Sequence, residues 1–431
     1  MKLCSAWGNY PKIECNMFEP DSINELEKLL DNTPLIPHGN GRSYGDSALS
    51  KNILKSTKFN KFISFDDSSG LLHIQAGVLL SEILEVFVPK GWFLKITPGT
   101  KLITVGGAIA SDIHGKNHHI EGCFSQCVKD FRILLPNGNI VECSKEKTPD
   151  LWQATCGGMG LTGFILDAKI FLKRIPSNKI SQTTIKTRNL QETFEVFEQY
   201  SHSPYSVAWI DCLAKDSALG RSLVMIGDFM GGKPICSEKK NLTVPFNLPS
   251  CTLNTFSVKL FNHFYYHKTK ERLTHSVVDI DSFFYPLDAI YHWNRIYGKN
   301  GFVQYQFILP KKYSYEGLEK ILWTIAKSGK GSFLAVLKLY GPTNGNWLSF
   351  PLEGYSLALD FKLEAGLFDL LDKLDNIVLK HHGRIYLTKD ARVAKNIFEQ
   401  GYENIEKFRH FRKEIGAYSY FESIQSQRLE L

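Results

Sequence analysis

The chain lacks the long apolar run, about 18 residues, that a membrane-spanning helix needs. It also lacks any internal repeat of 20–50 residues, and its 33 glycines and 17 prolines show no collagen-like period. Apolar residues make up 43% of its 431 positions and charged residues 22%, which excludes a disordered chain or a coiled coil. A single core stops growing near roughly 250–300 residues, so we expect a packed protein of about two domains.

A large charge surplus of either sign is also missing. The 51 Lys and Arg against 44 Asp and Glu give a net charge of +7. This surplus is compatible with an anionic ligand or a lipid surface, but it falls short of the dense basic pattern of nucleic-acid binders. We therefore expect no nucleic-acid partner.

The nine cysteines include no C-x-x-C pair, and they are odd in number and scattered. The N-terminal stretch M-K-L-C-S-A-W-G-N-Y-P-K has no apolar segment of the signal-peptide type before Pro11. These features predict reduced thiols and a cytoplasmic location, with peripheral contact at the inner membrane left open.

Several familiar catalytic motifs are absent or out of context. His114, His118 and His119 are not part of an H-E-x-x-H motif and have no matching carboxylate, so no metal site is predicted. Residues 158–163 (G-M-G-L-T-G) match G-x-G-x-x-G, but they precede a strand pattern, whereas a Rossmann turn opens a helix.

The hydrophobic patterns predict an α+β protein. In the first third, Asn137-Gly138 is a strong signal for a two-residue hairpin between two short strands. After a break at 176–178, strand and helix patterns alternate, which predicts one sheet with helices on one face. The expected strands are 59–66, 71–76, 130–135, 139–143, 164–172, 206–212, 221–228, 302–309, 333–340 and 355–361, and the expected helices are 79–88, 149–155, 314–327 and 366–382.

Two loops are dense in glycine and hydroxyl groups, and both lie at strand–turn boundaries. Residues 39–46 read G-N-G-R-S-Y-G-D, and residues 97–115 read T-P-G-T-K-L-I-T-V-G-G-A-I-A-S-D-I-H-G. Successive free backbone N–H groups in such turns bind phosphate oxygens, and missing side chains let a flat ligand approach. For either loop alone, an ordinary turn is the alternative interpretation. Together with the glycines of 157–163 they predict one elongated, phosphate-bearing cofactor.

This set of motifs resembles the FAD domain of the vanillyl-alcohol-oxidase superfamily, with its PCMH-type FAD-binding fold. Within it, the chain most resembles the decaprenylphosphoryl-β-D-ribose 2-oxidase family. The likeness continues through A-W-I-D at 208–211, G-F-V-Q-Y-Q-F-I-L-P at 301–310 and G-R-I-Y-L-T-K-D at 383–390. It therefore runs in the same order along nearly the whole chain.

The resemblance implies a split architecture. Residues 1–177 would form a two-subdomain FAD-binding domain, 178–382 an inserted substrate domain with an antiparallel sheet, and 383–431 a segment that completes the FAD domain. The implied reaction is oxidation of the 2′-hydroxyl of a polyprenyl-phospho-β-D-ribose to the 2′-keto sugar. This is the first half of epimerisation to the arabinose donor used in bacterial cell-envelope polysaccharides. A short-chain reductase and a quinone-type electron acceptor would be its partners.

The resemblance also assigns the cofactor site. Covalent members of the superfamily carry a histidine just before the serine of the first loop, where this chain has Arg42, so we expect non-covalent FAD. The expected FAD-binding residues are Pro37, His38, Gly39, Asn40, Gly41, Arg42, Ser43, Tyr44, Gly45, Asp46, Ser47, Gly99, Thr104, Val105, Gly106, Gly107, Ser111, Asp112, Ile113, His114, Ile165 and Tyr386.

Three residues are candidates for catalysis. Lys389, in Y-L-T-K-D, would stabilise the anionic reduced flavin or hold the substrate hydroxyl; taken alone it reads as a surface lysine. A histidine ordinarily titrates near neutral pH, so His114 is a hypothetical general base, although a lone histidine is more often structural. The third candidate for catalysis, Tyr44, is implied by the family resemblance alone.

The resemblance places seven residues in the substrate pocket: Lys116, Trp209, Tyr285, Gln304, Gln306, Lys338 and Lys389. Gln304 and Gln306 share one face of a strand, which suits sugar hydroxyls, although an exposed polar face is the default interpretation. The chain departs from the family pattern at Ala358, where well-known members carry cysteine, and at Ser356, where a larger amide is common.

Two other functions stay open from the sequence. One is an FAD-dependent alditol or aldonolactone oxidase that acts on a free sugar derivative. The other is a flavin-binding subunit without catalysis that docks a reductase at a membrane. The polar, aperiodic stretch 231–256 is the expected surface loop at the substrate entrance.

Overall fold

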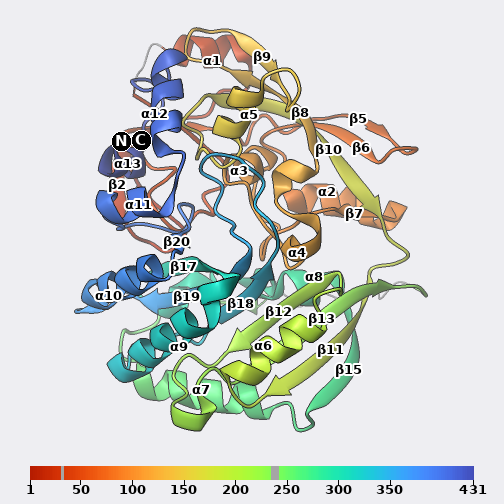
Figure 1. Ribbon diagram of the computed structural model, residues 1–431. Coiled ribbons are helices and arrows are strands. Elements are labelled where there is room, and N and C mark those ends of the chain that lie inside the picture. The colour runs from red at the N-terminus through yellow and green to blue at the C-terminus, as the bar shows by residue number, and fades with distance from the viewer. Residues whose placement is uncertain (31–33, 234–241) are drawn as a thin grey trace.

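A computed structural model describes residues 1–30, 34–233 and 242–431. The chain folds into two parts (Figure 1). The upper part contains both ends of the chain, and the lower part is a broad sheet built from the middle of the chain.

The N-terminal segment forms a four-stranded sheet in the order β1-β2-β4-β3. β1 pairs with β2 antiparallel, and the other pairs are parallel. β3 ends at His38 and is followed directly by the glycine-rich loop that starts at Gly39. The elements are β1 (Lys2–Ser5), β2 (Lys12–Phe18), α1 (Ile23–Leu29), β3 (Ile36–His38) and β4 (Asn52–Lys55).

An antiparallel six-stranded sheet follows, in the order β5-β6-β10-β8-β9, with β7 paired to β10. Its apolar face packs on α2 and α3 in one buried cluster. Its strands are β5 (Phe62–Asp66), β6 (Leu71–Gln75), β7 (Trp92–Leu94), β8 (Val128–Leu134), β9 (Ile140–Cys143) and β10 (Phe164–Arg174). Its helices are α2 (Leu80–Phe87), α3 (Val105–Ala110), α4 (His118–Glu121) and α5 (Pro149–Thr155).

The lower part is an antiparallel eight-stranded sheet in the order β15-β11-β13-β12-β18-β19-β17-β20. A short parallel pair, β14 (Leu242–Thr243) with β16 (Ile290–Tyr291), lies outside it. The eight strands are β11 (Lys179–Thr187), β12 (Tyr205–Ile210), β13 (Ser222–Met230), β15 (Leu273–Asp279), β17 (Phe302–Pro310), β18 (Ala335–Tyr340), β19 (Gly354–Lys362) and β20 (Arg384–Ile385).

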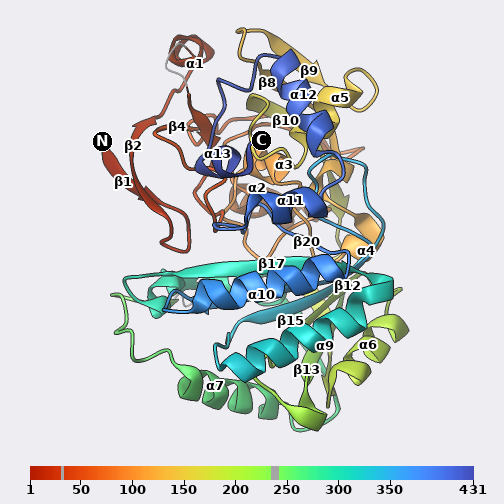
Figure 2. The same cartoon turned by 60° about the vertical axis from the view of Figure 1, so that its left-hand side comes forward.

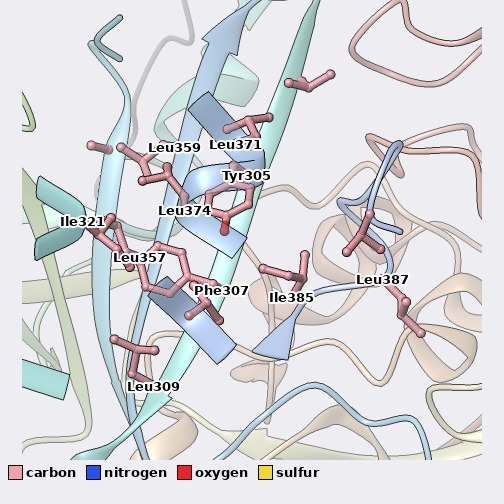
Figure 3. Packing of buried hydrophobic residues seen from close by; sticks show 14 of the residues in the cluster. Tyr305, Phe307, Leu309, Ile321, Leu357, Leu359, Leu371, Leu374, Ile385 and Leu387 are labelled. Atoms are coloured by element: carbon pink, nitrogen blue, oxygen red, sulfur yellow. The ribbon is translucent and has the colours of Figure 1, made fainter. Parts of the chain in front are cut away.

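Helices cover one face of this sheet. α6 (Leu190–Gln199), α9 (Lys311–Ser328) and α10 (Leu367–Lys380) lie side by side across it (Figure 2). Figure 3 shows how Tyr305 and Phe307 of β17 pack with Leu374 of α10 in the resulting core. Side chains alternate along a strand, so Gln304 and Gln306 point to the opposite face, toward the upper part.

The C-terminal segment returns to the upper part. Phe421 forms a parallel bridge with Leu35, and the Ile424 amide donates to the Leu49 carbonyl at 2.8 Å. The remaining helices are α7 (Thr255–His267), α8 (Ile280–Phe284), α11 (Lys395–Gly401), α12 (Ile405–Glu414) and α13 (Ile424–Leu429). Short 3₁₀ turns span Val88–Lys90, Phe124–Gln126, Asp216–Ala218, Pro286–Ala289 and Trp293–Tyr297.

The α+β prediction is confirmed, and a strand follows the glycines of 157–163 as expected. A hairpin at Asn137-Gly138 does connect β8 to β9, but its loop has three residues, 136–138, rather than the expected two, because Leu135 pairs with Asn139. β11, β15, α6 and α7 were not expected. Of the predicted loop 231–256, positions 234–241 lie outside the described residues. The remainder contains β14 and the first two residues of α7.

The prediction that all nine cysteines are reduced is wrong for one pair. Cys4 and Cys15 form a disulfide, with their Cα atoms 6.4 Å apart. They lie on β1 and β2, which pair antiparallel, so the hairpin brings together two residues whose spacing in the sequence carries no disulfide signal. Five of the free cysteines in the described part of the chain are buried, and Cys251 is exposed.

Candidate active site

A cavity of about 640 Å³ lies between the glycine-rich loops of the upper part and the uncovered face of the eight-stranded sheet. Its volume is in the usual range for ligand sites. Most of the residues predicted from the sequence line it. From the upper part these are Pro37, His38, Gly39, Asn40, Gly41, Arg42, Ser43, Tyr44, Ser47, Gly99, Thr104, Gly106, Gly107, Ser111, Ile113, His114, Lys116 and Ile165. From the sheet and the segment after it they are Trp209, Gln304, Gln306, Lys338, Tyr386 and Lys389.

Two predicted residues of the first loop lie behind the cavity wall. At Gly45 a side chain would collide with the Asp390 carbonyl, so this glycine permits a close approach of two backbone segments. The Asp46 carboxylate accepts from the Arg428 guanidinium at 2.8 Å, and Arg428 also donates to Asp390 at 2.9 Å. Burial raises the pKa of Asp46 to about 6. Both residues fasten the C-terminal segment to the cofactor loop.

Three other predicted residues do not line the cavity either. Val105 is fully buried in the apolar cluster of the six-stranded sheet. Tyr285 is 1% exposed, and its hydroxyl lies 2.7 Å from the Thr97 hydroxyl. Asp112 is buried as well and accepts a hydrogen bond from the Ser125 amide at 3.0 Å. These three residues therefore do not line the cavity, and their structural contacts explain their burial.

Asp112 also holds the loop that connects β18 to β19. Its carboxylate accepts from the side chains of Asn344 at 2.6 Å, Asn346 at 2.9 Å and Ser349 at 2.7 Å. Its backbone has a φ of +38°, a conformation that is uncommon for a residue with a side chain. This network fixes the backbone two residues before His114.

The first loop offers a row of unused backbone donors. Within the described part of the chain, the N–H groups of residues 39–43 donate to no acceptor. The loop touches the second one, because a side chain at Gly39 would collide with the Thr104 hydroxyl. No described atom lies within 4 Å of the position that a side chain of Gly99 would take. Free N–H groups and open glycine surfaces are what a diphosphate and a flat ring require.

Three of the four lysines that line the cavity have lowered pKa values. Burial lowers the pKa of Lys338 to about 8. Burial, with a contribution from Lys338, also lowers the pKa of Lys116 to about 7. The pKa of Lys389 falls to about 7 by burial, although the nearby Asp360 opposes this shift. An anionic ligand would raise these lowered pKa values and favour the charged form of the lysines, so the cavity is suited to phosphate or to an anionic ring.

His114 is buried against the sheet. The Gln306 side-chain amide donates to its Nε2 at 3.2 Å, which leaves the proton on Nδ1. Nδ1 has no partner among the described residues. Burial and the lysines at 338 and 389 lower the pKa of His114 well below its usual value, so the ring is neutral at physiological pH. A neutral ring with one unpaired N–H suits a bound ligand.

Lys389 and Tyr44 contact each other at the cavity wall. The Lys389 ammonium lies 3.9 Å from the centre of the Tyr44 ring. Burial raises the pKa of the Tyr44 hydroxyl well above its usual value, so it stays protonated and acts as a donor. Gln304 on β17 donates from Nε2 to the carboxylate of Asp360 on the neighbouring strand β19 at 2.5 Å. Burial raises the pKa of Asp360 to about 7.

Several wall residues were not predicted as site residues. The Arg42 guanidinium stacks on Trp7, 4.0 Å from the ring centre, and no motif points to Trp7. Asp288 belongs to the F-F-Y-P-L-D segment of the family likeness and accepts from the Lys101 amide at 2.8 Å. The two departures, Ser356 and Ala358, both face the cavity.

The residues present fit FAD. The free N–H groups of the first loop and the open glycines would hold the diphosphate, and the unpaired Nδ1 of His114 and the lysines would face the ring. In the described part of the chain, no group of His, Cys, Asp and Glu has the arrangement of a metal site. None of the helices in that part is long and apolar enough to cross a bilayer.

Comparison with known proteins agrees with this site. Residues 17–144 match the FAD binding domain family. The chain is 34% identical over 416 residues to decaprenylphosphoryl-β-D-ribose oxidase of Mycolicibacterium smegmatis, covering 92% of this chain and 89% of that protein. It is 28% identical over 373 residues to an uncharacterized protein of Streptomyces coelicolor, covering 82% of this chain and 100% of that protein.

More distant relatives match only part of the chain. A putative D-arabinono-1,4-lactone oxidase of Neurospora crassa is 24% identical over 207 residues, covering 47% of this chain and 36% of that protein. The match to the ribose oxidase, in contrast, includes the eight-stranded sheet as well as the cofactor loops. The chain therefore belongs to the decaprenylphosphoryl-β-D-ribose oxidase family of FAD-dependent oxidoreductases.

Proposed function

We propose that this enzyme oxidises the 2′-hydroxyl of a polyprenyl-phospho-β-D-ribose to the 2′-keto sugar, as the first half of an epimerisation to the arabinose donor. The observation that carries the proposal is the polar face of the sheet opposite the FAD loops. Gln304 and Gln306 on β17, Ser356 on β19 and Lys338 on β18 line the same cavity as His114.

The sheet face provides groups that match a ribosyl phosphate. Side-chain amides both donate and accept, which suits the vicinal hydroxyls of a furanose. Lys338 and Lys116 provide positive charge for the phosphodiester, and binding of that anion would raise their lowered pKa values. Lys116 Nζ also donates to the Phe283 carbonyl, which fixes its position at the wall.

FAD, when bound, supplies the acceptor for the hydride that leaves the ribose carbon. The task of the chain is to orient the sugar and to take up the hydroxyl proton. His114 is neutral, so its Nε2 accepts that proton once the Gln306 amide turns to the substrate. Lys389 provides the charge that favours the reduced ring, and Tyr44 remains a hydrogen-bond donor beside it.

The proposal includes the surroundings of the reaction. We expect non-covalent FAD because Arg42 occupies the position before Ser43. We also expect a quinone-type acceptor, a short-chain reductase that completes the epimerisation, and peripheral contact with the inner membrane. The proposed domain limits are 1–177 and 178–382, with 383–431 returning to the first domain. β20 within this segment still pairs with β17 of the sheet.

Anaerobic titration tests the proposal. The FAD-loaded enzyme is mixed with a polyprenyl-phospho-β-D-ribose, and the flavin absorbance near 450 nm is followed. We expect this substrate to bleach the flavin and free ribose to leave it oxidised. Bleaching by free alditols or aldonolactones, with none by the lipid-linked ribose, would instead identify the lactone-oxidase type of activity. An enzyme that no sugar bleaches would be a flavin-binding module.

A further inference from the structure

Helix α7 carries a row of large apolar side chains that face solvent. Phe256 is 74% exposed, Phe264 64%, Leu260 44% and Phe261 43%. Residues four apart lie one above the other on a helix, so Phe256, Leu260 and Phe264 form a single line with Phe261 beside it. We call these four residues the α7 patch. Exposed apolar groups in one contiguous patch usually mark an interaction surface.

The opposite side of α7 is firmly attached to the sheet. Val258, Asn262 and Tyr266 are buried. Asn262 Nδ2 donates to the Asp211 carboxylate at 2.7 Å, and the Tyr266 hydroxyl donates to the Thr187 carbonyl at 3.0 Å. The helix is therefore held in place with its patch turned outward. It lies at the lower rim of the molecule, away from the FAD loops (Figures 1 and 2).

The segment around the patch is basic. Residues 244–270 contain Lys259, Lys268 and Lys270 and no aspartate or glutamate. All three lysines are exposed. An amphipathic helix with aromatic residues on its outer side and lysines around them is suited to the headgroup region of an anionic bilayer.

An aromatic path connects the patch to the active-site cavity. Phe261 stacks with Tyr265, with ring centres 5.6 Å apart, and Tyr265 packs on Trp209 at 4.7 Å. Tyr265 and Trp209 both line the cavity, together with Lys268. The cavity thus extends from the FAD loops to the inner side of α7.

We propose that the α7 patch docks the enzyme on the surface of an anionic lipid bilayer, so that the isoprenoid chain of the substrate enters the cavity past Tyr265 and Trp209. The inference deepens the proposed function and rests on it for the lipid nature of the substrate. A second copy of the chain fits the patch less well. A symmetric contact would set the lysines of one copy against the same lysines of the other.

Vesicle flotation with the intact FAD-loaded enzyme tests the docking. Wild type is compared on vesicles of phosphatidylcholine with 30% phosphatidylglycerol and on pure phosphatidylcholine. The test variant is F256S/F264S, and the control is Ile63→Ser, which removes an exposed apolar side chain (47% exposed) from β5 in the upper part. Flavin content and the thermal unfolding midpoint of each variant report folding.

We expect wild type and the control to float with the anionic vesicles and to bind neutral ones at least tenfold more weakly. F256S/F264S should bind the anionic vesicles at least tenfold more weakly than wild type. K259Q/K270Q should lose the preference for anionic lipid, whereas the exposed pair K58Q/K129Q should keep it. Equal flotation of wild type and F256S/F264S overturns the proposal. So does a wild-type dimer in solution that the same double substitution dissociates.

A turnover comparison separates this inference from the proposed function. Bleaching of F256S/F264S by a short-chain, water-soluble polyprenyl-phospho-ribose should match wild type, while turnover of the long-chain substrate in vesicles should fall at least tenfold. If the soluble substrate bleaches the flavin of wild type but wild type does not bind vesicles, the docking proposal is wrong and the proposed function stands. If no phospho-ribose bleaches wild type although vesicles bind it, the proposed function is wrong.

Discussion

We expect Lys338, which we propose binds the substrate phosphate, to lower the stability of the ligand-free protein, and its replacement by methionine tests this. Burial alone lowers its pKa from 10.5 to about 8. One pKa unit corresponds to about 1.36 kcal/mol, so holding this ammonium charged at pH 7 costs the fold up to about 3 kcal/mol. Methionine has a similar volume and no charge. The K338M apoprotein should therefore be about 2–3 kcal/mol more stable than wild type at pH 7, allowing for screening by water in the cavity.

The pH dependence gives the sign of the effect. The pKa of Lys338 is lower in the folded than in the unfolded state, so the unfolded state binds the proton more tightly below pH 10.5. The penalty is complete below about pH 8 and disappears as the pH rises toward 10.5. The stability gain of K338M should therefore fall to about half by pH 9.5.

The assay is guanidinium unfolding of FAD-free protein at pH 7 and pH 9.5, followed by circular dichroism. Lys129→Met, at an exposed position on β8, is the matched control and should change stability by less than about 0.5 kcal/mol. The same K338M substitution should weaken substrate binding. The reasoning is refuted if K338M is less stable than wild type at pH 7, or if its gain does not change with pH.

Four further outcomes follow from the site. Acid precipitation should release all flavin into the supernatant because Arg42 replaces the histidine of covalent relatives; flavin left in the pellet would contradict this. Asp112→Ala should lower the free energy of unfolding by about 2–4 kcal/mol in denaturant titrations, since the side-chain amides it holds lose their acceptor. An unchanged denaturation midpoint would show that Asp112 does not stabilise this loop. His114→Ala should slow anaerobic flavin reduction by about 10²–10⁴-fold at unchanged flavin content. An unaltered rate would exclude it from the chemistry. Arg428→Met should lower the free energy of unfolding by about 3–5 kcal/mol at pH 8 and by less at pH 5. The pKa of Asp46 is about 6, so its carboxylate needs the Arg428 partner at pH 8, whereas the protonated carboxyl at pH 5 does not. A loss independent of pH would refute that pairing.

The glycine-rich loops that line the cavity were predictable because their signal is local. The glycines at 39 and 41 are visible in the sequence and predict a turn with unpaired backbone N–H groups. In the structure, the N–H groups of residues 39–43 donate to no described acceptor. The hairpin at Asn137-Gly138 was predictable for the same reason. The sheet face with Gln304 and Gln306 followed from the alternation of β17.

Other features depend on contacts between distant parts of the chain. The sequence cannot show that Tyr285 turns to Thr97 or that Asp112 holds a loop more than 230 positions later. The Cys4–Cys15 pair depends on the pairing of two strands. Helix α7 escaped prediction because apolar residues lie on both its inner and outer sides, which conceals the helical period.

The central claim is that the hydride leaves carbon 2 of a lipid-linked ribose. The most direct measurement is anaerobic stopped-flow reduction of the enzyme-bound flavin by polyprenyl-phospho-ribose deuterated either at carbon 2 or at carbon 3. We predict a primary isotope effect of about 3 or more on flavin bleaching with deuterium at carbon 2, and none with deuterium at carbon 3. A primary effect at carbon 3 alone, or bleaching only by free sugars, would contradict the proposal.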